Sequence, residues 1–124
     1  MNEKVTIIVR ILFGLFCLFF GLNNFAQFIV FPPIPGDGGE LLRIYGASGF
    51  MHLIAIMEIL GGLALLTKKY IPLALTVLIA ILFNATVFHA LHDPENIVGA
   101  LLGLIMGLVL VYAYKVRFFS LMSS

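Results

Sequence analysis

The fold is decided by residues 48–66, which read SGFMHLIAIMEILGGLALL and carry a single acidic group, Glu58. A helix needs about 20 predominantly apolar residues to cross a membrane, so this run predicts a span with Glu58 near its middle. A carboxylate at that depth costs roughly 2.5–3.5 kcal/mol on insertion scales unless it is neutralised or paired. Glu58 is therefore either a protonated group that hydrogen-bonds between helices or a functional group that handles protons or a ligand.

The whole chain shares this apolar character. Of its 124 residues, 62% are hydrophobic and 10% are charged, whereas a soluble domain carries about 25% charged residues. Residues 5–28, 71–91 and 97–114 predict three further spans. We expect an all-α integral membrane four-helix bundle, up-down-up-down, forming one domain over residues 1–124. This leaves no room for a separate catalytic domain, and a net charge of +1 excludes nucleic-acid binding.

The basic residues predict the orientation of the spans. With four crossings, the N-terminus, the turn between the second and third spans, and the C-terminus share one side of the membrane. Six of the seven Lys and Arg residues fall on that side, and Arg43 falls on the other. Because Lys and Arg are enriched in cytoplasmic loops, both termini are expected in the cytoplasm.

Three segments between the spans have patterns of their own. Residues 32–39 (PPIPGDGG) contain three prolines and three glycines and predict an irregular loop. Residues 40–45 (ELLRIY) predict a short amphipathic piece at the membrane interface. Residues 92–96 (HDPEN) predict a polar turn in which Asp93 or Asn96 caps the last span.

Polar side chains of the spans converge on the outer half of this topology. At about 1.5 Å per residue, Asn84 lies within roughly a turn of the height of Glu58, so Glu58 is expected to pair with Asn84 or a first-span asparagine rather than with His52. The expected buried polar cluster is Glu58, Asn84, Asn23, Asn24 and His89. The residues expected on a ligand or proton path are His52, His92 and Asp93. The asparagines also fit a purely structural role as hydrogen-bonding groups between helices, and no catalytic group can be named.

Small residues predict where helices approach closely. The expected packing positions are Gly14, Gly21, Gly61, Gly62, Gly99, Gly103 and Gly107. The last three are spaced four apart and favour either close packing within the chain or a homo-oligomer face. The lone Cys17 excludes an intrachain disulfide and is predicted to be a small packing residue.

Candidate cofactors can be tested against these residues. One buried glutamate cannot supply a di-iron site, and His89, His92 and Asp93 could form at most a surface zinc site, so no metal site is predicted. A bis-histidine haem through His52 and His89 is disfavoured. A quinone pocket lined by Phe, with His or Glu exchanging the proton, is compatible with the pattern but has no defining motif. The cofactor therefore stays open.

Three stretches are the most distinctive: GLNNF at residues 21–25, EILGGLALL at 58–66 and FHALHDP at 88–94. In this order, and over nearly the whole chain, the sequence resembles the DoxX-like family of small bacterial membrane proteins. Carried over by position, the recurrent polar and glycine positions of that family are Asn23 or Asn24, Glu58, Gly61, Gly62, Asn84, His89 and Asp93.

The resemblance implies a four-helix, multi-pass protein of the bacterial cytoplasmic (inner) membrane. Some members look like small subunits of thiosulfate:quinone oxidoreductase systems, and others are linked to oxidative-stress complexes with soluble redox enzymes. The leading hypothesis is thus an accessory subunit in quinone-linked redox or oxidative-stress metabolism, with redox-enzyme partner subunits. The alternatives are a homodimeric proton-coupled small-molecule transporter that uses Glu58, and a structural membrane scaffold without chemistry of its own.

Overall fold

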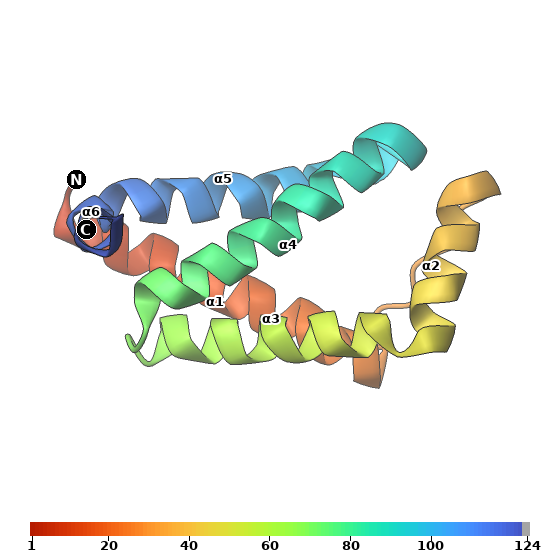
Figure 1. Cartoon of the computed structure of the whole chain (residues 1–124), viewed down its shortest axis with the longest axis horizontal. Coiled ribbons are helices and arrows are strands. Elements are labelled where there is room, and N and C mark those ends of the chain that lie inside the picture. Colours follow the sequence, from red (N-terminus) through yellow and green to blue (C-terminus); the bar gives the residue numbers. More distant parts are fainter. Residues whose placement is uncertain (123–124) are drawn as a thin grey trace.

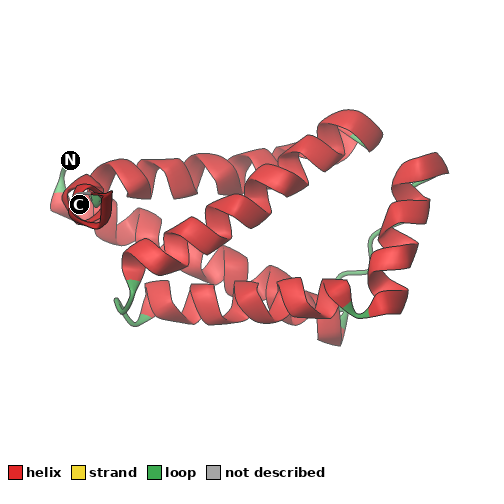
Figure 2. Cartoon of the chain, viewed as in Figure 1, coloured by secondary structure: helices red, strands yellow, loops and turns green. Residues whose placement is uncertain are grey.

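The computed structural model describes residues 1–122, and this part of the chain is helical, without a β-strand (Figure 2). The helices are α1 (Glu3–Ala26), α2 (Gly36–Ser48), α3 (Phe50–Leu66), α4 (Ile71–His92), the 3₁₀ helix η1 (Pro94–Asn96), α5 (Ile97–Ala113) and α6 (Lys115–Met122). Helices α1, α3, α4 and α5 begin and end within two residues of the predicted spans. Polar or helix-breaking residues bound each apolar run, which explains this agreement.

Helices α1, α3, α4 and α5 run lengthwise beside one another, whereas α2 and α6 run across them (Figure 1). The most extensive contacts join α1 to α3 and α4 to α5, and further contacts join α3 to α4 and α1 to α5. Both termini and the α3–α4 turn lie at one end of this assembly, and α2 lies at the other (Figure 1). We call the first the basic end, for the charges described below, and the second the α2 end.

The buried core is made almost entirely of aliphatic and aromatic side chains. Its members are Phe13, Cys17, Leu65, Ile71, Ala74, Leu75, Leu78, Leu82 and Leu110. Large apolar side chains also cover the outside of the helices, with Leu60, Leu73 and Leu102 all more than half exposed. An apolar exterior on this scale suits a lipid environment, where apolar side chains need no shielding from water.

Glycines allow α1 and α3 to touch backbone to backbone. A Cβ atom added to Gly62 would lie 2.8 Å from the carbonyl oxygen of Gly14 and 2.9 Å from the amide nitrogen of Leu18. One added to Gly21 would lie 2.8 Å from the carbonyl oxygen of Ala55. These distances leave no room for a side chain, so the α1–α3 seam depends on small residues at these positions.

Two of the three glycines of α5 pack against other helices of the same chain. A Cβ atom added to Gly103 would lie 2.7 Å from the Phe16 ring of α1, and one added to Gly107 would lie 2.8 Å from Ile79 of α4. Gly99 faces open space. Two positions of the predicted stripe are therefore occupied by intramolecular packing, and only Gly99 is left for contact with a second copy.

A tight turn makes α3 and α4 direct neighbours. Lys68 and Tyr70 in this turn adopt left-handed backbone conformations, with φ of 60° and 53°. Farther along the two helices from the turn, Gly61 of α3 packs against Leu78 of α4, and a Cβ atom added to Gly61 would lie 2.8 Å from the leucine side chain. The glycine lets the two helices stay close after the chain reverses direction.

The expectation of an irregular loop over residues 32–39 is wrong for its second half, because α2 already begins at its glycines. A Cβ atom added to Gly38 would lie 2.6 Å from that of His92, and one added to Gly39 would lie 1.8 Å from the carbonyl oxygen of Ile34. Glycine has a poor helix propensity, but here the close contacts with His92 and with the nearby Ile34 backbone require it and outweigh that preference.

α2 does not continue into α3, because the chain bends by 80° between them. Gly49, at the bend, has a φ of 84°, a left-handed conformation that glycine adopts without strain. In the described part of the chain, α1, α4 and Pro94–Ala113 are long and apolar enough to cross a membrane, and the bent α2–α3 pair makes a fourth if it counts as one span.

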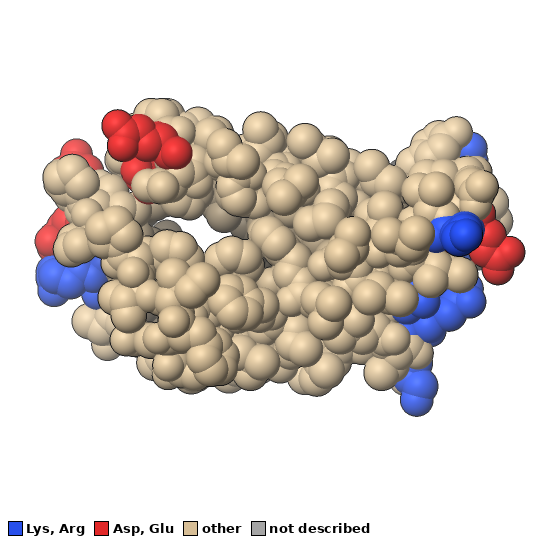
Figure 3. All heavy atoms as spheres, turned by 180° about the vertical axis from the view of Figure 1, so that it is seen from behind, with Lys and Arg blue, Asp and Glu red and all other residues tan. Residues whose placement is uncertain are grey.

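Charged side chains gather at the two ends of the molecule (Figure 3). The basic end carries Lys4, Arg10, Lys68, Lys69, Lys115 and Arg117, together with Glu3. At the α2 end, Arg43 donates from Nε to Oε2 of Glu40 at 3.1 Å, and this bond holds the pKa of Glu40 below its usual value. The one basic residue of the α2 end is thus neutralised by a neighbouring carboxylate.

Candidate functional site

Glu58 faces α1 from the middle of α3. It lies one helical turn from Ala55 and one from Gly62, both of which contact the α1 backbone. Its carboxyl group is half-buried and interacts electrostatically with Cys17, the buried thiol on the facing side of α1. No hydrogen bond to this carboxyl is formed by any residue between 1 and 122. Glu58 is therefore an acid held between apolar helices without a polar partner.

The expected pairing of Glu58 with Asn84 is not formed. Asn84 is exposed on the outside of α4, and its side-chain amide donates to the carbonyl oxygen of Ala80 in its own helix at 2.8 Å. The two residues match in height, but α4 turns Asn84 outward. This local bond satisfies the Asn84 amide, as is common for polar side chains in an apolar medium.

Asn23 and Asn24 are not joined to Glu58 either. Asn23 is buried, and its amide group donates to the carbonyl oxygen of Ile29 at 3.0 Å and accepts from the Ile29 amide at 2.8 Å. This pair of bonds fixes the chain as it leaves α1, where Gln27 adopts a left-handed conformation. Asn24 is half-buried beside it. Asn23 therefore shapes the loop after α1.

His89 and Asp93 form the one close pair among the predicted site residues. The Nδ1 atom of His89 lies 3.4 Å from Oδ2 of Asp93, and both side chains are largely buried. The Asp93 carboxylate accepts two bonds from the Asn96 side-chain amide, at 2.9 and 3.1 Å, so Asn96 orients the carboxylate instead of capping α5. Nδ1 itself is buried and makes no hydrogen bond within the described residues. A buried polar atom without a hydrogen bond is uncommon in native proteins and marks His89 as a candidate functional residue.

His52 lies apart from that pair. It is exposed in the first turn of α3, and its ring stacks on Phe25 of α1 at a centroid distance of 4.9 Å and an interplanar angle of 11°. This contact ties the beginning of α3 to the end of α1. His52 therefore has a packing role in the described structure.

His92 marks the place where α2 meets α4. Its ring lies 5.3 Å from that of Phe88, and its Cβ touches Gly38 of α2. Helix α2 thus reaches from α3 across to the end of α4. Seen from behind, the molecule is hollowed between α2 and the α4–α5 pair (Figure 3). The His89–Asp93 pair belongs to the last turn of α4, at this same end.

Arg10 is a residue whose role sequence reasoning missed. We counted it among the basic residues that predict the orientation of the spans, yet it is buried, with 8% of its surface exposed. Its guanidinium donates to the carbonyl oxygen of Leu65 in the last turn of α3, and its Nε makes no hydrogen bond among residues 1–122. A cation suits the carbonyl-rich end of a helix. The available signal was its position inside an apolar run, between Val9 and Ile11.

Comparison with protein-family models, curated proteins and solved structures finds no match to this chain. Within residues 1–122, no three His, Cys, Asp or Glu side chains are grouped so that they could hold a metal ion.

The arrangement offers two separate chemical functions. Glu58, between apolar helices, can take up or release one proton. The imidazole ring of His89, whose Nδ1 lies 3.4 Å from the Asp93 carboxylate, has a nitrogen that can donate or accept a hydrogen bond. The candidate residues are thus divided between an acid in the α1–α3 seam and a histidine–aspartate pair at the α2 end.

Proposed function

We propose that this chain crosses a bacterial cytoplasmic membrane as a four-helix bundle, up-down-up-down, with both termini in the cytoplasm. Support for this topology comes from the gathering of six of the seven basic residues at the end that holds both termini. Helix α3 is about 25 Å long, somewhat shorter than the hydrocarbon core of about 30 Å. In this topology α2 lies in the outer interface.

Within that topology the chain is a DoxX-like accessory subunit in quinone-linked redox or oxidative-stress metabolism. The observation that carries this proposal is the isolation of Glu58, a mid-span acid without a hydrogen-bond partner among the described residues. An acid that served only to join helices would be paired across the seam. Intramembrane acids without such a partner serve proton transfer or ligand binding.

The residue that would contact a quinone is His89, whose buried Nδ1 faces Asp93 and makes no hydrogen bond among the described residues. A bound quinone would supply two-electron redox chemistry that consumes or releases protons. His89, held next to Asp93, would orient the quinone ring at the α2 end, and Glu58 would exchange a proton deeper in the membrane. The electrons would come from a soluble or membrane redox-enzyme partner.

The test replaces Glu58 with Gln in the native membrane and measures quinone-linked electron flow and recovery of the partner enzyme. Because loss of a positioned acid or base lowers rates about 10²-fold or more, Glu58→Gln should lower electron flow strongly while the protein remains in the membrane. Glu95→Gln, an exposed acid in η1, is the matched control and should change nothing. Equal electron flow in both variants would remove Glu58 from the proposal.

A second measurement examines the ligand directly. The protein, extracted from its native membrane in mild detergent, should retain a quinone identifiable by mass spectrometry, and His89→Ala should lose it. A Soret absorption band would instead show a bound haem and would contradict the quinone assignment. A colourless protein without quinone, together with a silent Glu58→Gln, would favour the scaffold.

The transporter alternative predicts a substrate whose binding depends on pH through Glu58. It also needs a face for a second copy, and two of the three α5 glycines expected to form that face are occupied within the chain. Cross-linking between cysteines placed at position 99 of two copies would restore this alternative.

A further inference from the structure

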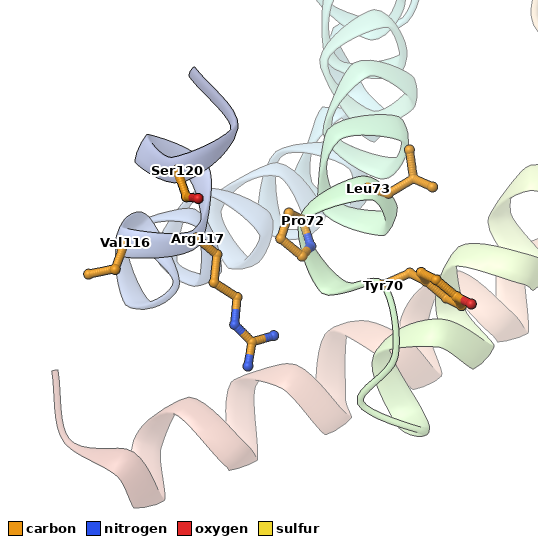
Figure 4. A pocket seen from close by; sticks show the side chains of 6 residues that line it. All are labelled: Tyr70, Pro72, Leu73, Val116, Arg117 and Ser120. Carbon is orange, nitrogen blue, oxygen red and sulfur yellow. The ribbon is translucent and has the colours of Figure 1, made fainter. Parts of the chain in front are cut away.

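A cavity of about 450 Å³ lies at the basic end between the start of α4 and α6 (Figure 4). It is lined by Tyr70, Pro72, Leu73, Val116, Arg117 and Ser120. The guanidinium of Arg117 extends from α6 into the space between α6 and the turn that precedes α4, as Figure 4 shows. The cavity therefore combines apolar walls with a cation near its opening.

A second cavity, of about 280 Å³, continues from the first along the surface between α3 and α4. Tyr70 and Leu73 line both cavities, and on α3 the second extends from Met57 to Ala64. That distance along a helix is about 10 Å. One leaflet of the hydrocarbon core is about 15 Å deep. The groove thus fits within the leaflet nearest the basic end.

The charges around the first cavity favour an anion. Neither cavity is lined by Asp or Glu. Arg117 lies over the Tyr114 ring at 5.3 Å and forms no ion pair with any residue between 1 and 122. The neighbouring turn adds Lys68 and Lys69. Arginine binds phosphate through two parallel hydrogen bonds, which makes an unpaired guanidinium at a membrane interface suitable for a phosphate group.

We propose that the two cavities together bind one anionic phospholipid of the cytoplasmic leaflet. Its phosphate contacts Arg117, and one acyl chain occupies the groove between α3 and α4. Tyr70 lies at the junction, where an aromatic ring with a hydroxyl group suits the boundary between headgroup and hydrocarbon. The proposal rests on the membrane topology proposed above and is independent of the chemistry of Glu58.

The experiment titrates the purified full chain in detergent with phosphatidylglycerol or phosphatidylethanolamine and follows bound lipid by native mass spectrometry. One basic residue near a membrane surface contributes about fivefold in affinity for an anionic lipid. Arg117→Gln should therefore weaken phosphatidylglycerol binding about fivefold. Lys115→Gln removes the same charge from the same helix, but Lys115 lies over the Tyr112 ring and outside the cavity, so it should have little effect.

Leu73→Trp tests the groove separately. Leu73 is 64% exposed, so the larger ring can fill the cavity without entering the core, and it should weaken both lipids. Glycerol 3-phosphate, which has the phosphate without the chains, should not compete. Equal losses for Arg117→Gln and Lys115→Gln, equal binding of the two lipids, or competition by glycerol 3-phosphate would each overturn the proposal.

Two controls separate this result from other failures. The thiol of Cys17 should remain protected from a maleimide dye in every variant, which shows that the helices are still packed. Glu58→Gln should bind phosphatidylglycerol like the parent chain. A loss of electron flow with normal lipid binding, or the reverse, then identifies which of the two proposals has failed.

Discussion

Gly62→Ala should weaken the α1–α3 seam, and the size of the effect follows from the contact it creates. The new Cβ would lie 2.8 Å from the carbonyl oxygen of Gly14, where ordinary contact begins at 3.4 Å, so the two helices must separate by the difference, about 0.6 Å. Overpacking of this kind costs about 1–3 kcal/mol. Alanine recovers up to about 1 kcal/mol through its better helix propensity.

Gly99→Ala is the matched control, because Gly99 is also helical but faces open space. It gains from the same propensity and has no overpacking cost, so the difference between the two variants isolates the seam. That difference is about 1–3 kcal/mol. At roughly 4 °C per kcal/mol for a chain of this size, the midpoints should differ by about 4–12 °C.

The chain provides its own probe for this measurement. Cys17 is the sole cysteine, is 1% exposed, and lies on α1 between Gly14 and Gly21. Its labelling by a thiol-reactive dye during heating in mild detergent reports separation of α1 from its neighbours. Equal midpoints for Gly62→Ala and Gly99→Ala would refute the close backbone contact from which the argument starts.

Two further predictions concern the α2 end. Gly49→Ala should lower the melting temperature measured by circular dichroism, because the left-handed φ of 84° costs a residue with a Cβ about 1–2 kcal/mol. The control is Gly46→Ala, in open space within α2, which should leave the melting temperature unchanged or raise it. Arg43→Gln should raise the pKa of Glu40 toward its usual value, which carboxyl carbon NMR can follow. Because pairing lowers that pKa in the folded chain, the pair stabilises α2 above the pKa of Glu40 in the unfolded chain. This stabilisation is lost as the pH falls through the lower pKa of the folded chain, and an unchanged titration in Arg43→Gln would contradict the pairing.

The positions of the long apolar helices could be predicted because length and composition are sufficient for that purpose. The run that became α3 ends at Thr67, Lys68 and Lys69, and Pro94 stops α4 from continuing. Polar and helix-breaking residues act locally, so no knowledge of neighbouring helices is needed. The packing glycines were identifiable for a related reason, since small residues in apolar helices mark close contacts.

The rotation of each helix could not be predicted in the same way. Asn84 and Glu58 were matched by height, which follows from the helical rise alone. Which side of α4 faces inward depends on its neighbours, and α4 is apolar on all sides, so no amphipathic stripe indicates it. The Asn84 amide can form a hydrogen bond either to another helix or to its own helix, and it donates to the carbonyl oxygen of Ala80 in its own helix.

Tertiary contacts explain the remaining differences. Gly38 belongs to a helix because it packs against His92, far away in sequence, and a run of glycines by itself indicates a loop. The pairing of His89 with Asp93 had a local signal, since residues four apart on a helix are neighbours. We assigned these two residues to separate roles, so that spacing was not used.

The seam itself gives the strongest reason to assign Glu58 a function. The residues one turn before and after it, Ala55 and Gly62, are small because the α1 backbone presses against them. Among the described residues, the neighbour with which the carboxyl interacts is Cys17 of α1. The packing that holds α1 to α3 therefore comes from the glycines and does not need the acid. A carboxyl group that is unfavourable between apolar helices and unnecessary for their packing is therefore the first residue to replace in the test of the proposed function.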